Sequence, residues 1–257
     1  LAGNPNCGKT TMFNNITGAK QHVGNYAGVT VEKKEGYKKF DGHELLFIDL
    51  PGTYSLTARS LDELVARNVI VNDNPDVIVN VLDASNLERN LYLAAQLLEL
   101  EKPMVIALNM SDVAEDMGIK YDLKKMAEMT GATIVSTVGR TNIGTKELLE
   151  ATVSVAASQK APGVTINYGD LLEGKISELV EELKQAGTVT YPLRWVAVKL
   201  LEKDADVIGK VMRFENTEAV IEKAKAIREE IKDQVDLDVI FQEYRHRFAV
   251  EVYNTCL

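Results

Sequence analysis

The stretch Gly3-Asn4-Pro5-Asn6-Cys7-Gly8-Lys9-Thr10 decides the fold of this chain, because it matches the pattern G-x-x-x-x-G-K-[ST] at every constrained position. In proteins with this pattern, a glycine-rich loop turns its backbone N–H groups toward the phosphates of a nucleotide. Lys9 is placed to reach the β- and γ-phosphates, and the Thr10 hydroxyl is placed to ligate Mg²⁺. The residues expected to contact the nucleotide in this segment are Asn4, Pro5, Asn6, Cys7, Gly8, Lys9, Thr10 and Thr11.

The residues beside this octet agree with a phosphate-binding loop. Residues 9–17 carry apolar side chains at helical spacing, and Gly18 follows them as a stop signal. A glycine-rich loop that merely precedes a helix remains the alternative for the octet taken alone. Only two residues precede Gly3, although a strand should feed such a loop, so we expect a few residues of that strand to be missing from the start of this chain.

The tetrad Asn109-Met110-Ser111-Asp112 indicates which nucleotide is bound. It follows a buried-strand pattern at residues 103–108, and open α/β sheets place their ligands at the carboxyl ends of strands. The Asp112 carboxylate can accept two hydrogen bonds from guanine, whose N1–H and exocyclic amine form a donor pair that adenine lacks. A site built in this way discriminates by a factor on the order of 10⁴. Taken alone, N-x-x-D would be a turn with Asx-type caps, but downstream of a phosphate loop it predicts guanine contacts from Asn109, Met110 and Asp112.

The stretch Asp49-Leu50-Pro51-Gly52 supplies a third part of the site and also follows an apolar strand pattern, residues 45–48. We expect Asp49 to hold Mg²⁺ through a water molecule and the Gly52 N–H to bind the γ-phosphate. The loop 21–30 is rich in Gly and Asn and lacks apolar periodicity, which is typical of a mobile switch. Within it, Thr30 is the expected Mg²⁺ ligand, ordered only while the γ-phosphate is present.

The rest of the N-terminal part alternates strand and helix patterns. A hairpin is expected at Asp41-Gly42, between residues 29–40 and 44–50. Further buried strands are expected at residues 76–82 and 132–136, and helices at 60–71, 87–101, 123–129 and 146–156. This alternation predicts an α/β domain over residues 1–160 with a mostly parallel sheet and helices on both of its faces.

Beyond Ala161-Pro162-Gly163 the strand signals fade and helical stripes take over. One apolar stripe runs through residues 171–183, a second through 220–231 and a third through 239–252. The sequence therefore predicts a small all-helical domain over residues 164–257.

Composition excludes several classes of protein. Among 257 residues the formal net charge is −9, which disfavours a nucleic-acid partner. No run approaches the ~18 consecutive apolar residues that a membrane span needs, and no signal-peptide pattern occurs, so we expect this fragment to be soluble. The two cysteines are far apart and suit a reducing cytoplasm. His22, His43 and His246 lack metal-site spacing, so we expect no Fe²⁺ ligand among them.

Several stretches together resemble the GTPase domain of the ferrous iron transport protein B (FeoB) family: residues 3–10, 24–32, 49–56 and 109–112. The run Asp83-Ala84-Ser85-Asn86-Leu87-Glu88-Arg89-Asn90-Leu91-Tyr92-Leu93 resembles that family too, and generic small GTPases do not share it. The likeness covers the chain to about residue 158 and continues less specifically into the helical remainder. It implies an α/β, P-loop (Ras-like) GTPase domain followed by a helical spacer.

The resemblance also implies a biological setting. In that family the two domains form the cytoplasmic, N-terminal portion of a bacterial inner-membrane protein that imports Fe²⁺, and the helical spacer is credited with slowing nucleotide release. The implied partners are GTP or GDP and the membrane-embedded iron-permeation domain of the same polypeptide, which is absent here. A homo-oligomer formed through the full-length protein is a further implied possibility.

The expected chemistry is slow hydrolysis of GTP by Lys9, Thr30, Gly52 and Asn6. Thr53 stands where Ras-like enzymes have a water-positioning Gln and is too short for that task, and no arginine finger is evident. In FeoB-like and related potassium-activated GTPases, an Asn at the position of Asn6 helps to bind K⁺ beside the phosphates. A cation there would neutralise charge as an arginine otherwise does.

Three departures from the family pattern modify this expectation. Cys7 stands where Ser or Ala is usual, and we expect its side chain to lie near the phosphates as an inert thiol. Tyr26-Ala27 replaces Trp-Pro and leaves the switch loop less rigid. The base-stacking loop, represented here by Thr137, Val138 and Gly139, is atypical, so guanine should be held more loosely there.

Two functions fit these observations. The first is a regulatory GTPase coupled to Fe²⁺ transport, and the second is a potassium-activated GTPase associated with RNA or the ribosome. The acidic charge, the run of residues 83–93 and a helical appendage with no recognisable RNA-binding module favour the first. Whether hydrolysis drives or gates transport stays open at this point.

Overall fold

The computed structural model describes all residues from 1 to 257. The chain forms two compact units, one made of Leu1–Val164 together with Ala249–Leu257, and the other of Thr165–Phe248. The last residues belong to the first unit through contacts such as the hydrogen bond from the Asp122 N–H to the Cys256 carbonyl oxygen, at 2.7 Å.

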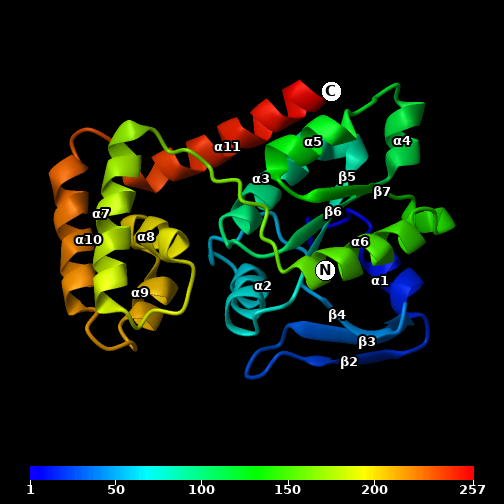
Figure 1. Cartoon of the computed structure of the whole chain (residues 1–257), viewed down its shortest axis with the longest axis horizontal. Coiled ribbons are helices and arrows are strands. Elements are labelled where there is room, and N and C mark those ends of the chain that lie inside the picture. The colour runs from blue at the N-terminus through cyan, green and yellow to red at the C-terminus, as the bar shows by residue number, and fades with distance from the viewer. The chain divides into compact units, whose positions relative to one another are not determined.

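The first unit is built on a parallel sheet whose strands follow the order β1-β5-β6-β7 (Figure 1). These strands are β1 (Ala2–Gly3), β5 (Ile78–Asp83), β6 (Met104–Asn109) and β7 (Thr133–Ser136). Strands β5 and β6 are almost completely buried, as expected of parallel strands covered on both faces. In their register Asp83 pairs with Asn109 and Leu108 with Ser136, so the segments that follow these strands leave from one edge of the sheet.

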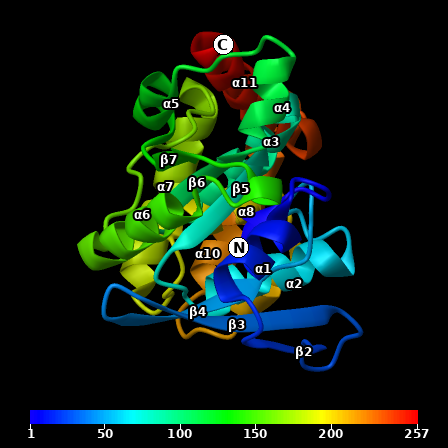
Figure 2. The ribbon, with the colours of Figure 1, turned by 90° about the vertical axis from the view of Figure 1, so that its right-hand side faces the viewer.

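An antiparallel hairpin sheet, in the order β2-β3-β4, completes the strands of this unit. Strands β3 (Glu32–Phe40) and β4 (His43–Asp49) join at the predicted turn, where Asp41 and Gly42 both have positive φ. Helix α1 (Lys9–Thr17) contacts both of these strands (Figure 2). The Leu50 N–H donates to the Leu1 carbonyl oxygen over 3.0 Å, which ties the end of the hairpin to the start of the parallel sheet.

Strand β2 (Gln21–Asn25) corrects one expectation. The segment 21–30 was predicted to be a loop throughout, but its first half pairs with β3, with Gln21 opposite Gly36 and Asn25 opposite Glu32. All five residues of β2 are exposed. An edge strand held by backbone pairing, without a buried face, leaves no apolar alternation in the sequence. The predicted strand from residue 29 in turn begins only at Glu32.

Helices cover both faces of the parallel sheet: α1 and α6 lie on one side, α3 and α5 on the other (Figure 1). Besides α1, the helices of this unit are α2 (Leu61–Asn72), α3 (Leu87–Leu98), α4 (Ser111–Asp116), α5 (Leu123–Thr130) and α6 (Thr145–Ser158), with short 3₁₀ turns η1 (Ala84–Asn86) and η2 (Gly139–Thr141). The core joins α1 to the sheet and α6 through the buried side chains Met12, Phe13, Ile16, Val79, Val81, Val105, Ala107, Leu148 and Leu149. Helix α4 was not predicted, because six residues are too few to show a helical period.

The second unit is helical, as predicted. Its helices are α7 (Asp170–Ala186), α8 (Leu193–Leu201), α9 (Ala205–Val211), α10 (Glu218–Ile231) and the first part of α11 (Leu237–Cys256). Helices α7, α8 and α10 pack on one another, with α7 and α10 contributing buried side chains of the expected stripes. Helix α8 was not predicted. Leu171 and Val239 were assigned to these stripes wrongly, since both side chains are exposed.

A buried ion network lies within the second unit. Arg245 on α11 is fully buried and donates to Glu202 over 2.6 Å, and Lys199 on α8 pairs with the same carboxylate at 2.7 Å. Burial disfavours the charged Glu202 carboxylate, but the two neighbouring cations outweigh burial and lower its pKa to about 2.

Candidate nucleotide-binding site

The predicted phosphate loop joins β1 to α1 and has the left-handed backbone that such a loop requires. Asn6 has φ 66° and Gly8 has φ 85°. At Gly8 there is also no space for a side chain, because a Cβ would lie 2.2 Å from the Asn109 amide nitrogen. The Gly8 carbonyl accepts the first helical hydrogen bond of α1 from Met12, which leaves the earlier N–H groups of the helix for a ligand.

Asn109, at the end of β6, ties two loops of the site together. Its side-chain amide donates to the Cys7 carbonyl oxygen at 2.9 Å. Its side-chain oxygen accepts from the Gly139 N–H at 2.9 Å and from the Thr137 hydroxyl at 3.3 Å. The residue is only 2% exposed. Asn109 therefore positions the phosphate loop and the loop after β7 relative to each other.

One cavity of about 450 Å³ gathers the residues predicted to bind Mg²⁺ and the γ-phosphate. Lys9, Thr10, Thr30, Asp49 and Gly52 all line it, although they come from three separate segments of the chain. The two hydroxyls and the carboxylate in this set are hard oxygen donors, which is the chemistry that Mg²⁺ prefers. Asn6 does not line this cavity and is exposed on the phosphate loop.

Lys9 is held inside this cavity by two oxygen atoms. Its ammonium lies 2.5 Å from Asp49 Oδ1 and 2.5 Å from the Leu50 carbonyl oxygen. Both side chains of the pair are nearly buried, so each charge compensates the other.

Gly52 brings the end of the Asp49–Gly52 segment against the phosphate loop. A Cβ on Gly52 would lie 3.2 Å from Pro5 Cα, which is tighter than ordinary contact. The next residue, Thr53, is buried and donates its N–H to the Gly3 carbonyl oxygen over 3.2 Å. The Thr53 side chain does not line the cavity, so it offers no group to orient a water molecule there.

Cys7 contradicts the expectation that its side chain lies near the phosphates. The residue is 1% exposed and belongs to the apolar cluster of Phe13 and Val81. The left-handed turn at Asn6 directs the loop so that this side chain points into the core. Burial raises the pKa of the Cys7 thiol to about 11, so the thiol is uncharged at neutral pH.

Asp112, the predicted guanine reader, lies in the first turn of α4 at the same edge of the sheet. Its Oδ2 atom is 2.8 Å from Arg140 Nε and 2.6 Å from a terminal nitrogen of the same guanidinium. The hydrogen bond from Arg140 holds the pKa of the Asp112 carboxyl below its usual range. Arg140 was missed in the sequence, because a single exposed arginine in a polar loop carries no pattern.

Several of the other predicted contacts have buried side chains and present mainly their backbones. Thr137 and Val138 are buried, and the Gly139 carbonyl accepts from the Asn15 amide at 2.6 Å. Asn4 is buried as well and donates to the Arg89 carbonyl oxygen over 3.4 Å. Pro5, Met110 and Thr11 lie beside these residues on the phosphate loop, before α4 and on α1, respectively.

Residues 83–93 stabilise the segments around the site through hydrogen bonds and a cation–π contact. The Ser85 N–H and hydroxyl both donate to Asp83 Oδ1, and the Asn90 side chain accepts from the Asp83 N–H. The Arg89 guanidinium lies over the Tyr54 ring, 4.2 Å from its centroid. The segment that follows Gly52 is thereby packed against α3.

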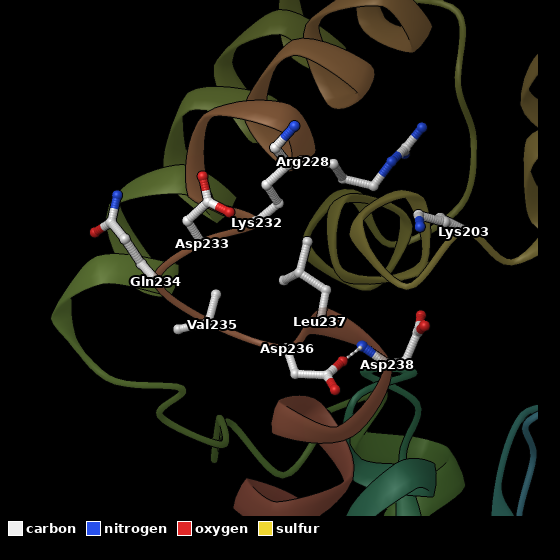
Figure 3. Close-up of a pocket in the computed structure, with 9 residues that line it drawn as sticks. All are labelled: Lys203, Arg228, Lys232, Asp233, Gln234, Val235, Asp236, Leu237 and Asp238. Carbon is white, nitrogen blue, oxygen red and sulfur yellow. Dashed lines mark hydrogen bonds between the residues drawn. The ribbon is translucent and has the colours of Figure 1, made fainter.

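A second hollow of about 380 Å³ lies in the helical unit, before and around the start of α11 (Figure 3). Its lining carries three basic and three acidic side chains. Arg228 donates to the Leu200 carbonyl oxygen at 2.6 Å, Lys232 pairs with Glu229, and Asp236 accepts from the Asp238 N–H. Its charges are therefore balanced, and it shows no preference for an anionic or cationic ligand.

Two further findings concern metals and membranes. No group of three or more His, Cys, Asp and Glu side chains is arranged to hold a metal ion. None of the helices combines the length and the apolar character that crossing a bilayer would demand.

The parallel sheet, the loop at Gly3–Thr10 and the appended helices define a P-loop GTPase-like α/β domain followed by a helical domain. Comparison with protein families agrees: the model for ferrous iron transport protein B matches residues 1–152, and that for the FeoB cytosolic helical domain matches residues 168–257. The chain belongs to the ferrous iron transport protein B (FeoB) family.

Relatives of known name are considerably longer than this chain. The Fe(2+) transport protein A/Fe(2+) transporter FeoB fusion protein of Porphyromonas gingivalis is 45% identical over 212 residues, covering 80% of this chain and 25% of the relative. The Fe(2+) transporter FeoB of Staphylococcus aureus is 38% identical over 237 residues, covering 92% of this chain and 34% of the relative. The chain thus spans about a quarter to a third of the length of these relatives.

Solved structures of similar proteins match over the whole chain. The cytosolic domain of the T. maritima FeoB iron transporter in its GMPPNP form has a TM-score of 0.87 at 32% identity, covering 100% of this chain and 97% of that one. A GDP-bound mutant of S. thermophilus NFeoB has a TM-score of 0.89 at 37% identity, with the same coverage.

Proposed function

We propose that this chain binds GTP and GDP together with Mg²⁺ and hydrolyses GTP slowly, as the cytoplasmic regulatory part of a bacterial Fe²⁺ transporter. The observation that carries the proposal is the cavity that gathers Lys9, Thr10, Thr30, Asp49 and Gly52. Membership of the FeoB family and the guanine nucleotides bound to its solved relatives support the same function.

The proposed Mg²⁺ ligands are the hydroxyls of Thr10 and Thr30, with Asp49 acting through a water molecule. Bound Mg²⁺ would neutralise charge on the phosphate oxygens. Thr10 and Thr30 are both exposed to solvent, whereas Asp49 is buried beside Lys9. Thr30 follows the turn in which the Val29 N–H donates to the Tyr26 carbonyl oxygen, so its position depends on the conformation of that turn. The proposal therefore makes Thr30 the ligand that is sensitive to the γ-phosphate.

Lys9 and the Gly52 N–H are the proposed γ-phosphate contacts. Lys9 exchanges the Leu50 carbonyl oxygen for phosphate oxygens, a stronger charge-assisted contact. Thr53 has no side-chain group in the cavity, and we propose that hydrolysis is slow for this reason. Asn6, exposed on the loop, is the proposed K⁺ ligand that compensates in part.

The proposed setting is the cytoplasmic face of the bacterial cell membrane, with the membrane-embedded iron-permeation domain of the same polypeptide as partner. Within this scheme residues 1–160 bind the nucleotide, and residues 164–257 form the spacer that slows its release. Assembly of several copies through the full-length protein belongs to the same proposal. A GTPase associated with RNA or the ribosome is disfavoured by the family membership and by the formal net charge of −9.

The decisive experiment measures the affinities of GDP and ADP by calorimetry, before and after Asp112→Ala. We expect GDP to bind much more tightly than ADP, by a factor on the order of 10⁴ for a site built around this donor pair. Asp112→Ala should abolish the preference, whereas Asp116→Ala, which removes an exposed carboxylate from the same helix, should preserve it. Equal affinities for GDP and ADP in the unmutated protein would refute the guanine assignment.

A further inference from the structure

Arg140 forms an ion pair with Asp112, the residue whose carboxylate is proposed to bind guanine. Two of its guanidinium nitrogens approach a single oxygen, Asp112 Oδ2, at 2.8 and 2.6 Å. The Arg140 side chain is 73% exposed and that of Asp112 is 23% exposed, so the pair lies at the rim of the site.

The loop that carries Arg140 is held in place by backbone contacts. The Gly139 N–H is bound to Asn109, and the Thr141 N–H donates to the Val138 carbonyl oxygen over 3.1 Å. Val138 and Ile143 also form an isolated antiparallel bridge across the loop. Arg140 therefore starts from a fixed backbone position within reach of Asp112.

We propose that Arg140 competes with guanine for Asp112, and that it lowers both the affinity and the base selectivity of the site. The inference rests on the proposed role of Asp112 in guanine binding. The guanine N1–H and exocyclic amine need both carboxylate oxygens, and Arg140 holds one of them. The ion pair must open before the base can be read in full.

The same contact weakens selection against adenine. A site with a lone carboxylate rejects adenine because the carboxylate would be left desolvated and without a partner. With Arg140 in place, Asp112 keeps a partner when adenine enters. Removing Arg140 should therefore favour GDP over ADP more strongly than in the unmutated protein.

The first test compares Arg140→Gln with the unmutated protein, using a fluorescent GDP analogue for rates and calorimetry for affinities of GDP and ADP. An exposed ion pair contributes little, so we expect GDP to bind about two- to fivefold more tightly. The gain should lie in the association rate, because the pair opens before binding. Lys146→Gln removes an equally exposed charge from α6, which follows the same loop, and should change nothing. Unchanged GDP affinity in Arg140→Gln would overturn the proposal, and weaker binding would overturn it by indicating that Arg140 holds the base.

The second test places the variant in an Asp112→Asn background and measures xanthosine diphosphate. An asparagine amide can donate to the second carbonyl oxygen of xanthine and cannot form an ion pair with Arg140. Arg140→Gln should then leave the affinity for xanthosine diphosphate unchanged. An equal gain in both backgrounds would overturn competition for Asp112.

The two proposals fail in different ways. If the unmutated protein does not prefer GDP to ADP, the guanine assignment fails and this inference falls with it. If the preference is present and depends on Asp112 while Arg140→Gln has no effect, only this inference fails.

Discussion

Asn6 both shapes the loop between β1 and α1 and presents a side chain to solvent beside it. Its left-handed backbone turns the Cys7 side chain into the core, while its own side chain stays exposed beside the loop. The residue that shapes the loop is thus also available to a ligand. No other side chain of this loop combines these two properties, because Asn6 is its only non-glycine residue with a positive φ.

We expect hydrolysis of GTP to be faster in KCl than in NaCl at equal ionic strength, by about 10-fold, since one compensating charge in the transition state contributes at least that much. Release of inorganic phosphate measures the rate. Asn6→Ala should remove the difference and leave GDP binding intact, whereas Asn14→Ala on the exposed side of α1 should retain it. Equal rates in the two salts would assign Asn6 to loop shape alone.

At the scale of elements, charged side chains join the end of helix α8 to helix α11. Lys199, Glu202 and Arg245 form a network in which both cations are buried. A buried network of this kind is costly to break, because removal of one member leaves the others uncompensated.

Glu202→Gln should lower the free energy of unfolding by about 3–5 kcal/mol at neutral pH, because two buried cations lose their partner. The effect depends on pH in a defined direction. The pKa of Glu202 is depressed from 4.5 to about 2, so the stabilisation is complete above about pH 4.5 and is lost as the pH falls toward 2.

Urea unfolding at pH 7 and pH 3 checks this prediction, with Glu218→Gln on the exposed surface of α10 as the matched control. The stability of Glu202→Gln should vary less with pH than that of the unmutated protein over this range. An unchanged unfolding free energy at pH 7 would show that the network contributes nothing.

The elements also show which parts of the fold the sequence determines locally. Strands β5 and β6 were predictable because nearly all of their consecutive buried residues are apolar, the polar exceptions being Asn80 within β5 and Asn109 at the end of β6. Strand β2 was not, because its five residues are all exposed and only backbone pairing holds them. Among the candidate site residues, Lys9, Asp49 and Asp112 were predicted from short local motifs. Arg140 and the inward turn of Cys7 depend on contacts between distant segments, which no local pattern encodes.

At the scale of the whole molecule, two units with separate buried cores share one chain. Under the proposed function only one of them binds the nucleotide. A ligand that binds a folded unit stabilises that unit by mass action, by about 2.7 kcal/mol at a concentration 100 times the Kd.

Thermal unfolding with and without GDP should therefore resolve the two units. Trp195, the single tryptophan of the chain, is buried in α8 and reports on the helical unit alone. We expect saturating GDP to raise the Tm followed by circular dichroism, which reports on both units, more than the Tm followed by tryptophan fluorescence. Identical shifts by every probe would mean that the chain unfolds as one cooperative body.

The hydrogen bonds of Asn109 link two loops, so the binding free energies of the two parts of a ligand that contact these loops should not be additive. One side-chain amide group holds the loop between β1 and α1 through the Cys7 carbonyl and the loop after β7 through the Gly139 N–H, and under the proposed function these loops bind the phosphates and the base. Whatever stiffens one loop lowers the ordering entropy that remains to be lost at the other. Guanosine and pyrophosphate, added as separate fragments, should each bind far more weakly than their share of the binding free energy of GDP suggests. Each fragment should bind more tightly in the presence of the other.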